Sequence, residues 1–258
     1  MSVLQLKRAP GDNETLDGPP HGPRFLQYRK GQRVASDDIL LAAVGHQVRP
    51  AATNMLDLGT GKGSVALMYL HANPGTTIVG LEAYPPSFEL AVRNRAINAS
   101  NNLDSPFVPV LCDLRHSQRV LGDRTFDLIT GAPPFIRVGH GIPPKNQQRR
   151  FGRIEERGGI EAYCHAVAHH LDRNVGVSVL LMDGQNKTRT TAAFNNAGLY
   201  LNQILDIVPR PNRPPIYQIF VGSYTDQPLR SYTVAMRNLT GNAWSTAYAT
   251  LRSMIGLL

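Results

Sequence analysis

Residues 55–70 read MLDLGTGKGSVALMYL, and this stretch decides the fold. An apolar run at residues 55–58 leads directly into a glycine-rich turn over residues 59–63, and a helical pattern begins at Ser64. Glycines in such a turn let the backbone pass close to a ligand, as in sheets that hold nucleotide-like cofactors at the carboxyl ends of their strands. The G-x-G-x-G spacing is neither the dinucleotide nor the Walker pattern, so it indicates neither a pyrophosphate nor a triphosphate site.

Strand-like and helical patterns alternate downstream of this turn. Apolar runs at residues 78–81, 108–111, 126–129 and 175–182 are separated by helical or polar segments, which is typical of a parallel sheet covered on both faces. Two β-rich runs, 200–208 and 216–224, are joined by PRPNRPP, which leaves no room for a crossover helix, so they are predicted to pair as an antiparallel hairpin. The predicted fold is therefore α/β, a Rossmann-like seven-strand sheet, mostly parallel with an antiparallel C-terminal hairpin, and a last helix over residues 242–255.

The N-terminal segment has a different composition. Residues 8–24 are rich in proline, glycine and charge, which predicts a flexible N-terminal leader over residues 1–24 and a single domain over residues 25–258. FLQYRKGQRV, at residues 25–34, is expected to form a short hairpin around Lys30 and Gly31, and Ser36 to cap a helix that begins at Asp37.

The composition restricts the expected cellular location of the protein and the partners that it could bind. The formal charge of +8 and the pI near 9.8 predict a field that attracts polyanions, with nucleic acid the first partner to test. Cys112 and Cys164 predict neither a disulfide framework nor a zinc site, and the histidines show no metal-ligand spacing, so no metal is expected. No stretch approaches the roughly 20 apolar residues of a membrane span, and a signal or transit peptide is not indicated, so the expected protein is cytoplasmic. Oligomeric state cannot be read from these features.

Polar groups stand at successive strand ends. Glu82 ends the second strand, one βαβ step beyond the glycine turn, where a carboxylate can accept both hydrogen bonds of a ribose diol. Asp113 ends the third strand and is placed to accept from an adenine amino group. The fourth strand ends in a Pro-Pro-aromatic turn, Pro133 to Phe135. Because the carboxyl ends of parallel strands share one edge, these groups predict a single site.

Four motifs carry a resemblance to a known family. DLGTGKGSVAL (57–67), LEAYP (81–85), LCDL (111–114) and FDLITGAPPF (126–135) have the order and spacing of class I S-adenosylmethionine-dependent methyltransferases. The last resembles the N-P-P-[YF] turn of enzymes that methylate exocyclic or amide nitrogens. SDDILL (36–41) and GGIEAY (158–163) are similar to segments of the tRNA N6-adenine methyltransferase family, and the similarity runs from about Phe25 to the C-terminus. The resemblance implies S-adenosylmethionine as cofactor, with these binding candidates: Asp37, Asp57, Gly59, Thr60, Gly61, Gly63, Glu82, Ala83, Asp113 and Leu114.

One position departs from the family pattern. The catalytic candidates are Ala132, Pro133, Pro134 and Phe135, and Ala132 stands where the family has Asn or Asp. In the family, the Asn or Asp side chain and the backbone carbonyl of the first proline accept the hydrogens of the target amine. Losing one such hydrogen bond costs about 1–3 kcal/mol, or roughly one to two orders of magnitude in rate. Slow activity, another substrate and loss of activity all fit this change.

A long polar insertion follows the Pro-Pro turn. IRVGHGIPPKNQQRRFGRIEERGG, at residues 136–159, is expected to be an irregular loop at the active-site mouth, where basic side chains would meet RNA phosphates. The function expected is N-methylation of an RNA base, with tRNA adenine N6 the first candidate. The alternatives are methylation of a protein amide or another base, and a non-catalytic module that binds RNA or a partner subunit. The nucleic-acid candidates are Arg137, Lys145, Arg149, Arg150 and Arg153.

Overall fold

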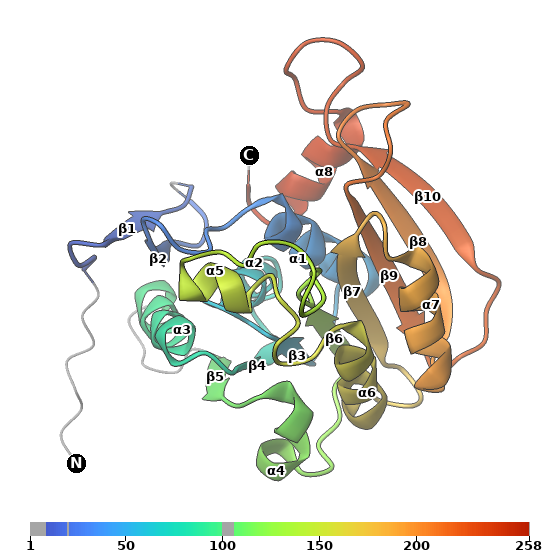
Figure 1. Ribbon diagram of the computed structural model, residues 1–258, viewed down its shortest axis with the longest axis horizontal. Helices are drawn as coiled ribbons and strands as arrows, with labels where there is room; N and C mark the ends of the chain where they lie inside the picture. The colour runs from blue at the N-terminus through green and yellow to red at the C-terminus, as the bar shows by residue number, and fades with distance from the viewer. Residues whose placement is uncertain (1–8, 20, 100–105, 258) are drawn as a thin grey trace.

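A computed structural model describes residues 9–19, 21–99 and 106–257. Its centre is a twisted sheet of eight strands in the order β10-β8-β9-β7-β6-β3-β4-β5, in which β9 runs opposite to the others (Figure 1). The predicted mostly parallel α/β sheet is therefore confirmed. Its strands are β3 (Asn54–Leu58), β4 (Thr77–Glu82), β5 (Phe107–Leu111), β6 (Leu128–Gly131), β7 (Val177–Asp183), β8 (Tyr200–Val208), β9 (Tyr217–Ser223) and β10 (Arg230–Ala235).

Helices cover both faces of the sheet and form two cores. The first core lies under α1 (Ser36–Val48), α2 (Ser64–Ala72), α3 (Pro85–Asn98) and α8 (Thr246–Met254). The second lies under α6 (Ile160–His170), α7 (Lys187–Asn196), the 3-10 turn η1 (Leu114–His116) and the short α4 (Ser117–Leu121). In β7, Val179 and Leu181 pack into the first core and Leu180 and Met182 into the second. Burial on both sides explains why this strand is a continuous apolar run. No helix among the described residues is long and apolar enough to cross a membrane.

The C-terminal part holds one strand that the sequence pattern did not predict. β8 and β9 pair antiparallel, with Leu205 opposite Ile219, so the predicted hairpin is confirmed. β10 then adds to the free edge of β8 in parallel, with Tyr232 opposite Leu205. The predicted seven strands thus become eight. The last helix, α8, begins at Thr246, inside the predicted range, after Ser245 accepts a hydrogen bond from the backbone of Tyr248.

The N-terminal predictions need correction. β1 (Glu14–Asp17) lies inside the predicted leader and pairs antiparallel with β2 (Phe25–Tyr28), so Phe25–Tyr28 does not form the expected hairpin around Lys30 and Gly31. Glu14 also forms an ion pair with Arg93 of α3, at 2.6 Å. The N-cap of α1 is Ala35, one residue before Ser36, and the Asp38 carboxylate accepts from its backbone N–H. The prediction of flexibility for residues 1–8 falls outside the described residues.

Candidate active site

The carboxyl ends of five parallel strands, β3 to β7, meet at a cavity of about 550 Å³. This size is in the range of small-molecule sites. The cavity brings together nine of the ten cofactor candidates and all four catalytic candidates. They are Asp37, Asp57, Gly59, Thr60, Gly61, Glu82, Ala83, Asp113, Leu114, Ala132, Pro133, Pro134 and Phe135. Gly63 is placed elsewhere: it is the N-cap of α2 and lies against the Phe107 ring, where a Cβ would come within 2.7 Å of it.

The glycine turn after β3 leaves open space on its cavity side. Gly61 has a φ of 60°, in the left-handed region that glycine adopts without strain, and a Cβ built there would meet nothing within 4 Å. Its backbone N–H donates to Glu82 Oε2 at 2.9 Å, and the N–H of Tyr84 donates to Oε1 at 2.7 Å. Glu82 therefore joins the turn to the end of β4. Burial raises the pKa of Glu82.

Asp57 supports the turn from inside the protein. It is buried at the end of β3 and accepts hydrogen bonds from the hydroxyls of Thr60, at 2.6 Å, and Thr130, at 2.7 Å. Burial raises the pKa of Asp57 to about 6, against the effect of these two hydrogen bonds. With both oxygens engaged, Asp57 orients the turn and β6.

Asp37 brings a third carboxylate to the cavity, from the first turn of α1. Its Oδ1 is buried and has no hydrogen-bond partner among the described residues. Burial and the neighbouring Asp38 raise the pKa of Asp37 to about 6. Asp38, by contrast, is tied to the fold, since it accepts from the hydroxyl of Ser64 at 2.7 Å. A buried carboxylate oxygen without a partner is costly unless a ligand compensates it, so Asp37 fits the ammonium group of a bound amino-acid moiety.

Asp113 lies at the cavity but is already paired. Its carboxylate accepts from the Arg115 backbone at 3.0 Å and forms an ion pair with the guanidinium at 2.7 Å. An adenine amine in this position would have to share these oxygens with Arg115.

The turn after β6 forms the opposite part of the cavity. Pro133 and Pro134 are buried, whereas Ala132 is exposed. The Phe135 ring lies 6.3 Å from the ring of Tyr217, the first residue of β9. Tyr163 of α6 packs beneath both turns, because a Cβ on Gly59 would collide with its hydroxyl and one on Gly131 would lie 2.8 Å from its ring. Burial strongly raises the pKa of Tyr163, so its hydroxyl stays neutral.

The insertion after this turn folds over the cavity. It contains α5 (Gln147–Phe151) and an isolated bridge between Ile136 and Ile154, so the expectation of an irregular loop is wrong. Buried Gln148 donates to the Ser87 hydroxyl at 3.0 Å and accepts from the backbone N–H of Gln32 at 2.8 Å. α5 is thereby fixed to α3 and to the segment before α1.

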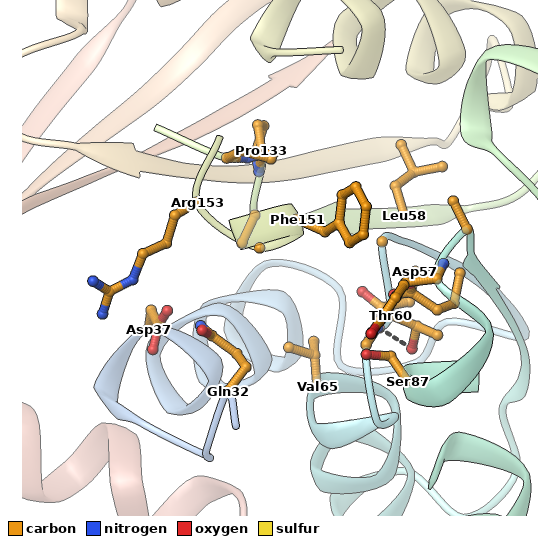
Figure 2. A pocket seen from close by; sticks show the side chains of 18 of the residues that line it. Gln32, Asp37, Asp57, Leu58, Thr60, Val65, Ser87, Pro133, Phe151 and Arg153 are labelled. Atoms are coloured by element: carbon orange, nitrogen blue, oxygen red, sulfur yellow. Dashed lines mark hydrogen bonds between the residues drawn. The ribbon is translucent and has the colours of Figure 1, made fainter. Parts of the chain in front are cut away.

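The Phe151 ring, at the end of α5, faces the cavity. Figure 2 shows it on the same side as Pro133, with Val65 and Thr60 across the opening. Tyr84 packs on it with ring centroids 5.0 Å apart, and the Arg157 guanidinium lies 4.1 Å from its centre. Phe151 therefore supplies an aromatic wall beside the end of β4.

The predicted nucleic-acid residues fall into two groups in the structure. Arg153 lines the cavity, on the same side as Asp37 in Figure 2, whereas the other four are exposed outside the lining. Arg150 forms an ion pair with Glu156 at 2.5 Å, and Arg149 Nε donates to the carbonyl of Gly31 at 3.1 Å. Arg137 and Lys145 form no ion pair with a described carboxylate.

Several cavity residues were not singled out from the sequence. Contacts between distant segments bring three of them to the cavity: Gln148, Phe151 and Tyr217. The fourth, Tyr163, was noted from the sequence only as part of a helix start. A signal existed for Phe151, since it is the aromatic residue of an otherwise polar insertion.

Comparisons with known proteins show which proteins the chain is similar to. No family model matches the chain. The chain is 24% identical over 210 residues to the tRNA1(Val) (adenine(37)-N6)-methyltransferase of Pseudoalteromonas translucida, covering 81% of this chain and 85% of the relative. It is 29% identical over 221 residues to the protein of that name from Pedobacter heparinus, covering 82% and 88%. It is also 32% identical over 159 residues to the release factor glutamine methyltransferase of Aliivibrio fischeri, covering 58% and 52%.

A solved structure extends the comparison to the fold. The crystal structure of a predicted O-methyltransferase from Agrobacterium tumefaciens superimposes with a TM-score of 0.61 at 16% identity, covering 86% of this chain and 97% of that one. The chain therefore shares the fold of the methyltransferase class to which that structure belongs. Within this class the chain resembles the tRNA1(Val) (adenine(37)-N6)-methyltransferases.

Proposed function

We propose that this protein transfers a methyl group from S-adenosylmethionine to a base nitrogen of RNA, with N6 of a tRNA adenine the first substrate to test. One observation carries the proposal: the cofactor candidates at the ends of β3 and β4 and the turn from Ala132 to Phe135 line the same cavity. The names of the relatives from Pseudoalteromonas translucida and Pedobacter heparinus support tRNA as the substrate.

The cavity residues fit the cofactor. Bound S-adenosylmethionine supplies an electrophilic methyl group on a sulfonium, so the protein has to orient the reactants and needs no metal for this chemistry. Glu82 would accept from the ribose hydroxyls, Asp37 would compensate the ammonium group, and Gly61 leaves room for close approach of the backbone. Phe151 and Tyr84 would cover the adenine ring.

The opposite wall would receive the target base. The carbonyl of Pro133 can accept one amine hydrogen, and the Phe135 and Tyr217 rings offer an aromatic surface for a base that leaves its stack. Ala132 offers no second acceptor, so the amine would be held by one hydrogen bond fewer than in the family pattern. Arg137, Lys145, Arg149, Arg150 and Arg153 would meet the phosphates around this opening.

A protein amide is the second candidate substrate. The Pro-Pro-aromatic turn suits amide nitrogens as well as exocyclic amines, and the similarity to the release factor glutamine methyltransferase supports this alternative. A non-catalytic role is the third, because the cofactor candidates are present while the amine acceptor is absent.

The test is methyl transfer by the purified protein. Unmodified tRNA transcripts and S-adenosylmethionine with an isotopically labelled methyl group are incubated with the wild type and with a Glu82→Ala control, and the digested nucleosides are analysed by mass spectrometry. Labelled N6-methyladenosine that depends on Glu82 is the expected result. In a parallel reaction with purified release factor, label in that protein and none in RNA would assign the second candidate. Cofactor binding without transfer to either would assign the third.

A further inference from the structure

A cluster of arginines surrounds the single tryptophan of the chain. Arg237 follows β10, Trp244 precedes α8, and Arg252 lies on α8. Arg237 lies 3.9 Å and Arg252 5.4 Å from the centre of the Trp244 ring. Arg210, in the link between β8 and β9, donates to the carbonyl of Asn238 at 2.7 Å and so brings that link to the same place. We call Arg210, Arg237, Trp244 and Arg252 the C-terminal cluster.

The backbone holds the cluster in place. Arg237 and Trp244 form an isolated antiparallel bridge, and the N–H of Asn238 donates to the carbonyl of Ala243 at 3.1 Å, so the two side chains face each other across a tight loop. Buried Tyr248 packs on the Trp244 ring with centroids 5.0 Å apart. This arrangement orders the guanidinium of Arg237 before any partner arrives, and such preorganisation lowers the entropic cost of binding.

The C-terminal region that carries the cluster is rich in positive charge. Residues 209–258 contain five arginines and one acidic residue, Asp226. Among the described residues, no carboxylate forms an ion pair with Arg210, Arg237 or Arg252, whereas Arg93, Arg115 and Arg189 are paired. Arg210 and Arg237 each donate to a loop carbonyl, and a guanidinium has five N–H donors, so further donors stay available.

The chemistry of the cluster matches single-stranded RNA. A guanidinium stacked on an aromatic ring still presents its N–H edge to phosphate oxygens, and exposed aromatic rings stack on unpaired bases. Trp244 remains 38% exposed. The arginines of the cluster form no ion pair with a described carboxylate, which argues against a basic protein partner, and the aromatic and planar cationic groups favour a nucleic-acid loop over a simple anion.

The cluster borders the proposed active site. The link that carries Arg210 continues into Ile216 and Tyr217, which line the cavity, and Tyr217 faces Phe135 of the catalytic turn. In Figure 1 this link and the loop before α8 rise side by side beyond β8 and α8, as the contact of Arg210 with Asn238 requires. RNA bound at the cavity would meet the insertion on one side and the cluster on the other.

We infer that the C-terminal cluster is an RNA-binding surface that contacts the unpaired nucleotides flanking the target base, and this inference rests on the proposed function. Because the chain has one tryptophan, intrinsic fluorescence reports on the cluster directly. Titration of the wild type with an unmodified tRNA transcript should quench or shift the Trp244 emission. Raising the salt from about 50 to about 200 mM should weaken the effect.

Two double variants distinguish a specific role of the cluster in RNA binding from a general effect of positive charge. Arg237→Gln with Arg252→Gln removes two charges from the cluster, and Arg119→Gln with Arg230→Gln removes two exposed charges elsewhere. Labelled-RNA anisotropy should show a dissociation constant raised about tenfold or more for the first pair, with the salt slope reduced by about two, and a much smaller change for the second. Trp244→Ala should weaken RNA binding by about fivefold or more. All variants should bind S-adenosylhomocysteine like the wild type.

Three results would overturn the inference. The first is Trp244 emission that stays constant while RNA saturates the protein, and the second is equal loss of affinity in the two double variants. RNA affinity unchanged in the cluster variants, as expected if a protein partner binds there, would overturn it too. If the wild-type protein bound S-adenosylhomocysteine but no RNA, this result would contradict the proposed function itself.

Discussion

The carboxylate of Glu82 accepts the backbone N–H of Gly61 at 2.9 Å, so the last residue of β4 holds the glycine turn that follows β3. The same side chain faces the cavity, where its remaining lone pairs can accept from a ligand. Glu82 thus shapes the turn and is available to bind the cofactor.

Replacing Glu82 by Ala should weaken binding of S-adenosylhomocysteine by about 1–3 kcal/mol, because ligand hydroxyls lose a charged acceptor and the turn loses its anchor. Isothermal titration calorimetry measures this. Glu82→Gln, which keeps one acceptor oxygen, should lose less. Equal affinity of the wild type and Glu82→Ala would remove Glu82 from the cofactor site.

The ionised Asp37 carboxylate should lower the stability of the ligand-free protein while favouring cofactor binding. Its pKa of about 6 lies above its ordinary value of 3.8, so between about pH 4 and 6 the folded state binds more protons than the unfolded state. The free energy of unfolding of the ligand-free protein should therefore fall as pH rises through this window. Asp57 has the same raised value and contributes in the same direction.

The variant Asp37→Asn should be more stable than the wild type at pH 7.5, by about 1–3 kcal/mol, because it removes a negative charge that burial and the neighbouring Asp38 disfavour. It should also bind S-adenosylhomocysteine more weakly. Urea unfolding and calorimetry give the two quantities, with exposed Asp123→Asn as the control. A less stable Asp37→Asn protein at pH 7.5 would contradict the raised pKa.

Phe151→Ala should lower cofactor affinity about tenfold, since the cavity loses the aromatic wall that Tyr84 and Arg157 hold in place. Calorimetry with S-adenosylhomocysteine is the measurement. Val138→Ala in the same insertion, where the side chain is 62% exposed, should have no effect. If both variants bind alike, α5 covers the cavity without touching the ligand.

Ala132→Asn should accelerate methylation of unmodified tRNA by about ten- to a hundredfold, because it restores a second acceptor for an adenine amine. Ala132 is exposed and the buried Pro133 and Pro134 fix the turn, so the longer side chain has room. Ala132→Leu adds similar bulk without an acceptor and should not gain. No gain on any adenine-containing RNA, with wild-type turnover of a protein substrate, would refute the adenine assignment.

The strands of the sheet could be predicted because burial on both faces makes them apolar runs. β10 could not, since its sequence RSYTVA lies at an edge where its first four residues are exposed. β1 reads ETLD within a proline- and glycine-rich segment, and it is stabilised by β2 and by Arg93, which lies 79 positions from Glu14 in the sequence. Such partners are not visible in a local pattern.

The cavity was predictable where it is built from strand ends, because parallel topology brings Gly61, Glu82 and Asp113 to one edge. It was not predictable where helices and loops close it. Tyr163 reaches the turns through the packing of α6, and Gln148 and Phe151 through the fold of the insertion. The contacts of Arg149 with Gly31 and of Arg150 with Glu156 likewise depend on how the insertion folds.

The hydrogen bonds of Gln148 determine when the cavity can close during synthesis. They join it to Gln32, 116 positions earlier, and to Ser87, 61 positions earlier. Since the ribosome releases the chain from its N-terminus, β3, β4 and β5 emerge well before α5, and Tyr217 emerges later still. A nascent chain that already carries Gly61, Glu82 and Asp113 but not α5 lacks these hydrogen bonds, so the enclosed site can form only after most of the protein has been translated.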